Sequence, residues 1–287
     1  MQKISILIIS LLILNSCATI FHISPSKKIS AIQFANTPHN NAYHFFYPNV
    51  ENDTILQRLN IEYKIPELVA GSKNEYEKVL RVLNWVRQQW EHNGWNNAKT
   101  NNPIEILERV KKGEKFRCVE YGIVLRNCLN AIGLPARTLG LMTRDVEKTK
   151  YGAGHVLAEV WLNDYQKWVM VDAQFNAIPF LNNTPLNAVE LQSAIIEKKP
   201  FKFVNIKGDF SESETANYMS FIPHYLYYFN SPFDSRRVKT EDVYKVNNKT
   251  HLLLVPKNAK NPSVFQRVYP IDYVEYTNNV ADFYAKP

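Results

Sequence analysis

Residues 116–141 read FRCVEYGIVLRNCLNAIGLPARTLGL, and this stretch decides the fold. Apolar residues occupy nearly every turn after Cys118, and the sequence Gly133-Leu134-Pro135 marks the end of the helix. A helix that is apolar on nearly all sides is usually central and buried. We therefore predict a buried helix over residues 118–132.

Cys118 is the first residue of this predicted helix. The first turn of a helix leaves backbone N–H groups without helical partners and has the positive end of the helix dipole. Both effects stabilise a thiolate, which is the nucleophilic form of cysteine. Cys128 lies in the middle of the same helix without this advantage, and we interpret it as a core residue. Cys118 is therefore the candidate nucleophile.

Two segments rich in β-branched and aromatic residues follow, at residues 155–162 and 168–172, and they predict two strands. The residues between them, 163–167, are polar. If Asn163 and Asp164 form a two-residue turn, the strands pair as an antiparallel hairpin. The turn then fixes the register, which the structure can test.

This register pairs Leu162 with Tyr165 and places His155 directly opposite Asp172. Directly opposed residues have Cβ atoms about 4.5–5.5 Å apart, within reach of an imidazole–carboxylate hydrogen bond. One face of the hairpin is apolar and is expected to be core: Val156, Ala158, Val160, Leu162, Val169 and Val171. The other face is mixed and is expected to line a cleft: His155, Glu159, Trp161, Trp168 and Asp172.

Cys118, His155 and Asp172 together match the roles of a nucleophile, a base and a group that orients the base. A lone histidine or aspartate in such a position is more often structural, so the joint arrangement supports the prediction. The sequence has no Cys-x-x-Cys pair and no His-x-x-x-His spacing, so we expect no metal site and no cofactor.

The sequence around these three residues resembles that of a known family. The segment 116–141 resembles the signature of transglutaminase-like domains, in which a nucleophilic cysteine opens a buried helix before Gly-Ile/Leu-Pro-Ala-Arg and a strand. Gly154-His155 resembles the histidine block of the family, and Trp168 to Asp172 resembles its Trp-Val-x-x-Asp block. The resemblance extends from near Ser72 to near Pro179. It implies an α+β fold, a transglutaminase-like (papain-related) core in which a central buried helix packs on an antiparallel sheet.

The resemblance also implies roles for single residues. Cys118 would be the nucleophile, His155 the general base and acid, and Asp172 the orienting residue. In the animal crosslinking enzymes an upstream tryptophan contributes to the oxyanion hole, and Trp95 is the candidate here, since Trp85 and Trp90 follow a helical core pattern. Arg137 is interpreted as structural. Glu120 is similar to a residue of the peptide N-glycanase branch, but a first-turn glutamate favoured by the helix dipole explains it more simply.

The N-terminus predicts export. Lys3 precedes the apolar run 4–14, which has the length of a signal-peptide core and is short for a membrane span. Leu14-Asn15-Ser16-Cys17 resembles a bacterial lipobox, with Cys17 as the lipidated residue; cleavage by ordinary signal peptidase stays open because Asn15 departs from the pattern. We expect a protein that is lipid-anchored to a bacterial membrane of the cell envelope, with the outer membrane favoured.

The composition is that of a globular protein, 45% hydrophobic and 21% charged over 287 residues. The formal charge of +7 is spread along the chain, so no nucleic-acid surface is indicated. We divide the chain into a signal peptide, a tether and docking segment, a transglutaminase-like core and a C-terminal extension: residues 1–16, 17–70, 71–180 and 181–287.

The leading hypothesis is an exported thiol-dependent amide hydrolase or acyltransferase with a Cys-His-Asp triad, acting on peptide, protein or wall-peptide substrates. A cysteine peptidase or amidase is favoured over a crosslinking enzyme. The alternative is a catalytically inactive transglutaminase-like binding module at the cell envelope. The triad alone does not decide between water and an amine as the acyl acceptor.

Overall fold

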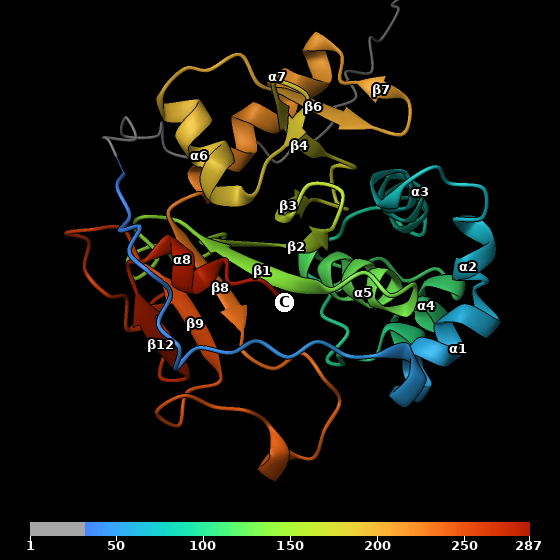
Figure 1. The fold of residues 1–287 in the computed structure, drawn as a ribbon, viewed down its shortest axis with the longest axis horizontal. Helices are drawn as coiled ribbons and strands as arrows, with labels where there is room; N and C mark the ends of the chain where they lie inside the picture. Colours follow the sequence, from blue (N-terminus) through green and yellow to red (C-terminus); the bar gives the residue numbers. More distant parts are fainter. Residues whose placement is uncertain (1–31) are drawn as a thin grey trace, which may run out of the picture.

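The structure, a computed structural model, describes residues 32–287 and has a six-stranded sheet at its centre (Figure 1). The strand order is β12-β9-β8-β1-β2-β3, and every neighbouring pair is antiparallel except β12 and β9. The strands of this sheet are β1 (Ala136–Met142), β2 (Gly154–Leu162), β3 (Lys167–Val171), β8 (Tyr228–Pro232), β9 (His251–Leu254) and β12 (Val274–Thr277). The C-terminal part of the chain thus extends the sheet that β1 to β3 begin.

The remaining strands form two smaller sheets. A four-stranded sheet has the order β5-β4-β6-β7, and β10 pairs with β11. Their bounds are β4 (Ile178–Leu181), β5 (Thr184–Pro185), β6 (Lys202–Asn205), β7 (Gly208–Asp209), β10 (Val264–Phe265) and β11 (Tyr269–Pro270).

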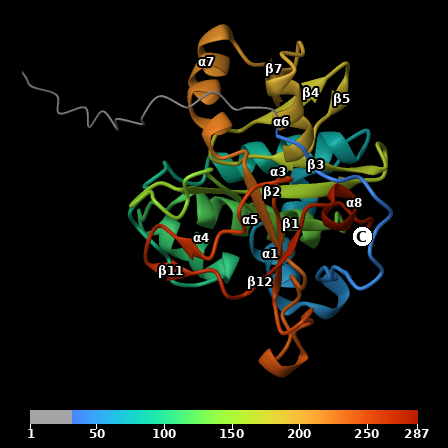
Figure 2. The ribbon, with the colours of Figure 1, turned by 90° about the vertical axis from the view of Figure 1, so that its left-hand side faces the viewer.

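All of the described α-helices except α8, which contacts β9, form two groups around the central sheet. Helices α1 to α5 gather on one side, and α6 and α7 lie with the four-stranded sheet at the top of the view (Figures 1 and 2). The helices are α1 (Thr54–Glu62), α2 (Ile65–Leu68), α3 (Glu75–Arg87), α4 (Pro103–Lys111), α5 (Cys118–Ala131), α6 (Ala188–Ile196), α7 (Glu212–Phe221) and α8 (Val280–Phe283), with 3-10 turns η1 (Val50–Asn52), η2 (Ile222–His224) and η3 (Thr240–Asp242). Helix α5 packs on β1 and β2, which gives the predicted α+β architecture.

Helix α5 begins and ends close to the predicted bounds. Before its first residue, Arg117 donates its backbone N–H to Glu120 Oε2 at 3.2 Å, which closes the first turn. Gly133 has φ +78°, the left-handed conformation that ends a helix without a Cβ clash. Nearly all side chains after the first turn are buried. The prediction of a buried central helix is confirmed.

Gly122 lets α5 approach β2 closely. A Cβ at this position would lie 3.0 Å from Val156 Cγ1 and 3.1 Å from the carbonyl oxygen of Leu157. Replacement by alanine gains about 1 kcal/mol of helix propensity, but overpacking against a backbone atom costs about 1–3 kcal/mol. We expect Gly122→Ala to lower the free energy of unfolding by about 1 kcal/mol in urea denaturation. A variant more stable than the wild type would show that α5 can move away from β2 at no cost.

The turn between β2 and β3 is wider than predicted. Leu162 pairs with Lys167 rather than with Tyr165, so the strands are offset by two positions from the predicted register. The turn ends on Gln166 in the left-handed conformation, with φ +50°. A glutamine gives no sequence signal for this conformation, which explains the error.

The predicted direct pairing of His155 with Asp172 is therefore wrong. Asp172 follows the last residue of β3, and the paired register of the strands brings it opposite Leu157 rather than His155. Side chains alternate between the faces of a sheet with a period of two, so an offset of two residues keeps both side chains on one face. Their contact is diagonal instead of direct.

Both faces of the hairpin are core. The apolar face packs with α5, as predicted. On the other face Glu159, Trp161 and Trp168 are buried, and the Trp168 indole N–H donates to the carbonyl of Ala285 at 3.0 Å. The prediction that these three residues line a cleft is wrong, because C-terminal residues cover them.

The N-terminal described residues lie against the rest of the fold. Asn60 on α1 donates its side-chain amide to the carbonyl of Ala131 at 2.8 Å, at the end of α5. Ala35 donates its backbone N–H to the carbonyl of Asn278 at 2.7 Å. Within residues 32–287, none of the helices has the length and apolar character needed to cross a membrane.

Candidate active site

Cys118, His155 and Asp172 lie together, and α5, β2 and the residue after β3 contribute one each. His155 Nε2 is 2.8 Å from Asp172 Oδ2, and the Cys118 side chain lies close enough to His155 to affect the pKa of the imidazole. Cys118 is half-buried, whereas His155 and Asp172 are buried. The geometry is that of a nucleophile, a base and an orienting carboxylate. The chemical roles of the three residues stay predictions.

Three groups donate hydrogen bonds to the Asp172 carboxylate. Oδ2 is 2.8 Å from His155 Nε2 and accepts from the Tyr218 hydroxyl, also at 2.8 Å. Oδ1 accepts the backbone N–H of Gln174 at 3.0 Å. A buried carboxylate needs such donors, because it loses its hydration on folding. No sequence pattern assigns Tyr218 to the site, since this residue lies far along the chain on α7.

The electrostatics of the site keep His155 protonated. Burial alone would lower the pKa of His155, but the Asp172 carboxylate and the Cys118 sulfur outweigh burial and raise this pKa from 6.5 to about 10. The site therefore places a positively charged imidazolium beside the Cys118 sulfur, an arrangement found around reactive cysteines.

Aromatic rings enclose His155. The ring of Phe221 meets it edge-on with centroids 5.0 Å apart, and Tyr225 and Phe175 lie at 5.9 Å and 6.3 Å. Phe221 ends α7 and Tyr225 follows η2, so two of the three rings come from the C-terminal part of the chain. They shield the histidine from water while the sulfur stays partly accessible.

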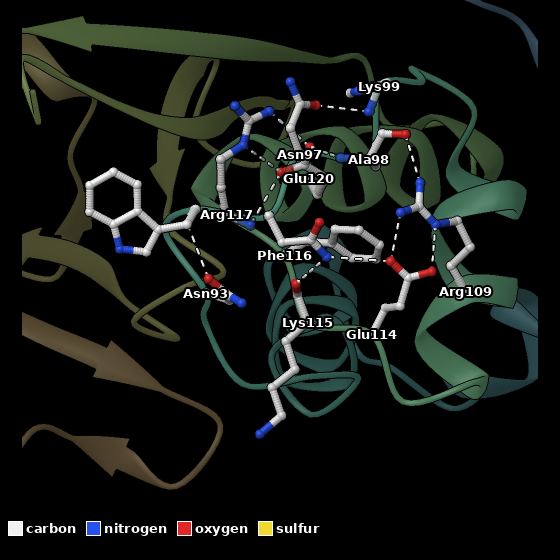
Figure 3. Close-up of polar contacts among 12 residues, drawn as sticks. Asn93, Asn97, Ala98, Lys99, Arg109, Glu114, Lys115, Phe116, Arg117 and Glu120 are labelled. Carbon is white, nitrogen blue, oxygen red and sulfur yellow. Dashed lines mark hydrogen bonds and ion pairs between the residues drawn. The ribbon is translucent and has the colours of Figure 1, made fainter.

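Polar contacts hold the loop between α3 and α4 against the start of α5 (Figure 3). Glu120 Oε1 accepts the backbone N–H of Ala98 at 3.0 Å and pairs with Arg117 Nη2 at 2.9 Å. Arg109 donates to the carbonyl of Ala98 at 2.7 Å and pairs with Glu114 at 2.6 Å. These contacts fix the first turn of α5 around Cys118. They give Glu120 a structural role, as its place in the first turn predicts.

Trp95 lies on this loop and is 73% exposed. Its ring meets the ring of Tyr151 edge-on with centroids 6.1 Å apart, and its indole N–H has no protein acceptor within residues 32–287. The loop runs beside the start of α5, because Asn93 donates its backbone N–H to the carbonyl of Phe116 at 2.9 Å. The role of Trp95 as an oxyanion donor stays a prediction. Trp90 is buried, as expected of a core residue.

The other residues of the sequence analysis lie away from the triad chemistry. Arg137 is fully buried in an ion pair with Glu159, consistent with a structural role. Cys128 is buried and free, and burial raises the pKa of its thiol. Cys17 lies outside the described residues. Among residues 32–287, His, Cys, Asp and Glu side chains form no group of three or more that could hold a metal ion.

Comparison with known families bears on the segment that holds the triad. Residues 64–173 match the model of the transglutaminase-like superfamily. This segment is a transglutaminase-like domain. The domain contains Cys118, His155 and Asp172, whereas Tyr218, Phe221 and Tyr225 lie outside it. No curated protein matches the chain.

Solved structures resemble the chain only weakly. A candidate cysteine protease from Cytophaga hutchinsonii is 16% identical with a TM-score of 0.33, over 50% of this chain and 46% of that one. A candidate protease from Parabacteroides distasonis is 17% identical with a TM-score of 0.31, over 55% and 29%. The transglutaminase of red sea bream is 12% identical with a TM-score of 0.28, over 42% and 25%. The chain spans less than half the length of each, and these values support no inference about function.

Proposed function

We propose that this protein is a thiol-dependent amide hydrolase or acyltransferase that uses Cys118, His155 and Asp172. The observation that supports the proposal is the convergence of these side chains at the start of α5, with the sulfur half-buried and the imidazole held by Asp172 at 2.8 Å. Peptides, proteins or wall peptides are the proposed substrates. A peptidase or amidase is favoured over a crosslinking enzyme.

The reaction follows from the positions of the three residues. The Cys118 thiolate attacks the carbonyl carbon of an amide, and backbone N–H groups at the start of α5 stabilise the oxyanion. The carbon–nitrogen bond then breaks as His155 gives its proton to the leaving amine, which leaves a thioester on Cys118. Water attacks the thioester while His155 takes its proton, and the carbon–sulfur bond breaks to release a carboxylic acid. A primary amine in place of water would give transamidation.

The proposed location is the bacterial cell envelope. The apolar run 4–14 and the lipobox-like sequence that ends at Cys17 support export and lipid attachment, and both lie outside the described residues. An acylated Cys17 would hold the domain at a membrane, with the outer membrane favoured. Mass spectrometry of the N-terminal peptide from membrane fractions tests this assignment.

The enzymatic proposal is tested by the reaction of the native protein with iodoacetamide at pH 7. We expect rapid alkylation of Cys118 and none of Cys128, because a thiolate beside an imidazolium reacts and a buried thiol does not. Cys128 therefore serves as an internal control in the same sample. A Cys118 that reacts no faster than Cys128 would contradict the proposal and favour the inactive binding module.

Turnover is tested with p-nitrophenyl acetate, an activated acyl donor that needs little substrate recognition. We expect acetylation of Cys118 and its release by water, with Cys118→Ala as the negative control. Transfer of the acetyl group to an added primary amine in preference to water would favour an acyltransferase over a hydrolase. Turnover by Cys118→Ala equal to that of the wild type would overturn the mechanism.

A further inference from the structure

We propose that Tyr218 is a positioning residue of the triad and that the C-terminal segment that contains it belongs to the catalytic unit. The inference rests on the proposed function. The Tyr218 hydroxyl donates to Asp172 Oδ2 at 2.8 Å, and His155 Nε2 meets the same oxygen at the same distance. Asp172 Oδ2 is thus shared by two groups that lie far apart in the sequence, the imidazole of His155 and the hydroxyl of Tyr218.

The Tyr218 ring is held in place by packing. Its side chain is fully buried, and its ring lies between those of Phe175 and Phe203, with centroids 4.7 Å and 4.8 Å away. A rigid ring keeps its hydroxyl at a fixed point and loses little conformational entropy on doing so. The hydroxyl is therefore a donor at a fixed position, and its hydrogen bond orients the Asp172 carboxylate.

The hydrogen bonds leave the carboxylate no freedom to rotate. The Gln174 backbone N–H binds Oδ1 at 3.0 Å, so both oxygens of Asp172 have donors. Rotation would break bonds on both sides of the group and leave buried donors without acceptors, which is unfavourable. Removal of the Tyr218 hydroxyl would release one of these constraints at the oxygen that faces the imidazole.

The hydroxyl also affects the charge on that oxygen. A hydrogen bond from a neutral donor disperses the negative charge of a carboxylate, which weakens its hold on a neighbouring proton. Without the Tyr218 hydroxyl, Asp172 would hold the imidazolium of His155 more strongly. His155 would then act as a base only at a higher pH. Removal of the Tyr218 hydroxyl should therefore have two separate effects. The Asp172 carboxylate is less well oriented, and His155 acts as a base only at a higher pH.

The same segment closes the site around His155. Phe221 and Tyr225 follow Tyr218 within a few residues and lie against the imidazole at 5.0 Å and 5.9 Å. Strand β8, which comes next, pairs with β1 and joins the segment to the central sheet. The matched domain ends at residue 173, so it contains the triad without the donor and the rings that complete its surroundings.

The test compares Tyr218→Phe with Tyr284→Phe in the full chain. The Tyr284 hydroxyl donates to Glu159 Oε1 at 2.9 Å, so both replacements remove a hydroxyl that binds a buried carboxylate. We expect Tyr218→Phe to lower the rate of thioester hydrolysis from p-nitrophenyl acetate about tenfold at saturation. The half-maximal pH of this step should move upward. Tyr284→Phe should stay within about twofold of the wild type, with a similar loss of stability.

The outcomes separate the two proposals. A Tyr218→Phe variant with wild-type turnover and an unchanged pH profile, in a wild-type protein whose Cys118 reacts, would overturn the positioning role alone. Equal losses of turnover in Tyr218→Phe and Tyr284→Phe would also overturn it, because they would indicate a general effect of stability. A wild-type Cys118 that is inert to iodoacetamide would overturn the proposed function and this inference together.

Discussion

Replacement of Asp172 by asparagine is expected to lower the turnover of p-nitrophenyl acetate by about 10³- to 10⁴-fold. The amide of the new residue cannot accept hydrogen bonds through its nitrogen. If its oxygen replaces Oδ2, the amide nitrogen meets the backbone N–H of Gln174, which is a donor. If its nitrogen replaces Oδ2, it faces the donors His155 and Tyr218. In that case His155 must take the other tautomer, with its proton on Nδ1, the ring nitrogen left for Cys118.

The same replacement should reverse the pH dependence contributed by His155. In the wild type the folded-state pKa of His155 is raised from 6.5 to about 10, so its stabilisation is complete below pH 6.5 and is lost as the pH rises to about 10. In Asp172→Asn the carboxylate charge is gone and only the Cys118 sulfur opposes burial, the largest single influence, so we expect burial to lower the pKa of His155. A depressed histidine pKa makes the fold lose stability as the pH falls through 6.5.

Both effects can be measured on the purified protein. Burst kinetics with p-nitrophenyl acetate give the acylation and deacylation rates, and urea denaturation from pH 5 to pH 10 gives the pH dependence of stability. Asp164→Asn is a matched control, because Asp164 lies in an exposed turn and binds the backbone N–H of Glu75. An Asp172→Asn variant that keeps more than a tenth of the wild-type turnover would show that the carboxylate does not orient His155.

The face on which the triad residues lie could be predicted from the sequence, although the register could not. Alternation with a period of two places His155 and Asp172 on one side for any even offset, and the structure is offset by two from the prediction. The exact pairing depends on the turn, where Gln166 takes a left-handed conformation that its residue type does not signal. The bounds of α5 can be predicted because apolar residues occupy nearly every turn after Cys118 and Gly133 marks the end of the helix.

The surroundings of the triad could not be predicted from local patterns. Tyr218 is 46 residues from Asp172, and its hydroxyl reaches the site only because α7 folds back over β2 and β3. Phe221 and Tyr225 depend on the same folding back. A sequence motif identifies residues by their spacing along the chain, whereas the contacts of these aromatic residues with the triad depend on tertiary packing.

One buried ion pair could have been found by counting the register of β1 and β2. Arg137 is the only charged residue of β1, Glu159 is the only acidic residue of β2, and the two are direct partners in the sheet. The alternating pattern instead predicts that Glu159, on the mixed face, lines a cleft. Its buried partner explains why the face is covered instead, since an ion pair with satisfied hydrogen bonds can be enclosed.

Arg137 connects the transglutaminase-like domain to the end of the chain. Its guanidinium donates to Glu159 Oε2 at 2.7 Å and to the carbonyl of Phe283 at 2.8 Å. It also lies over the rings of Trp168 and Phe283, 4.5 Å and 4.6 Å from their centroids. Burial alone would lower the pKa of Arg137, but Glu159 outweighs burial and raises it. The side chain is thus charged and enclosed by partners from both parts of the chain.

Arg137→Met is expected to lower the free energy of unfolding by about 3–5 kcal/mol, because it leaves the Glu159 carboxylate buried without its counter-charge. The double variant Arg137→Met/Glu159→Gln should recover about 1–2 kcal/mol of this loss, since an uncharged buried amide costs less than an unpaired charge. Glutamine also keeps an oxygen to accept the backbone N–H of Ala188 and the Tyr284 hydroxyl, which Glu159 binds at 3.2 Å and 2.9 Å. Urea denaturation of both variants and of Glu159→Gln completes a double-mutant cycle. A double variant less stable than Arg137→Met alone would show that the lost packing of the guanidinium, and not the stranded charge, accounts for the effect.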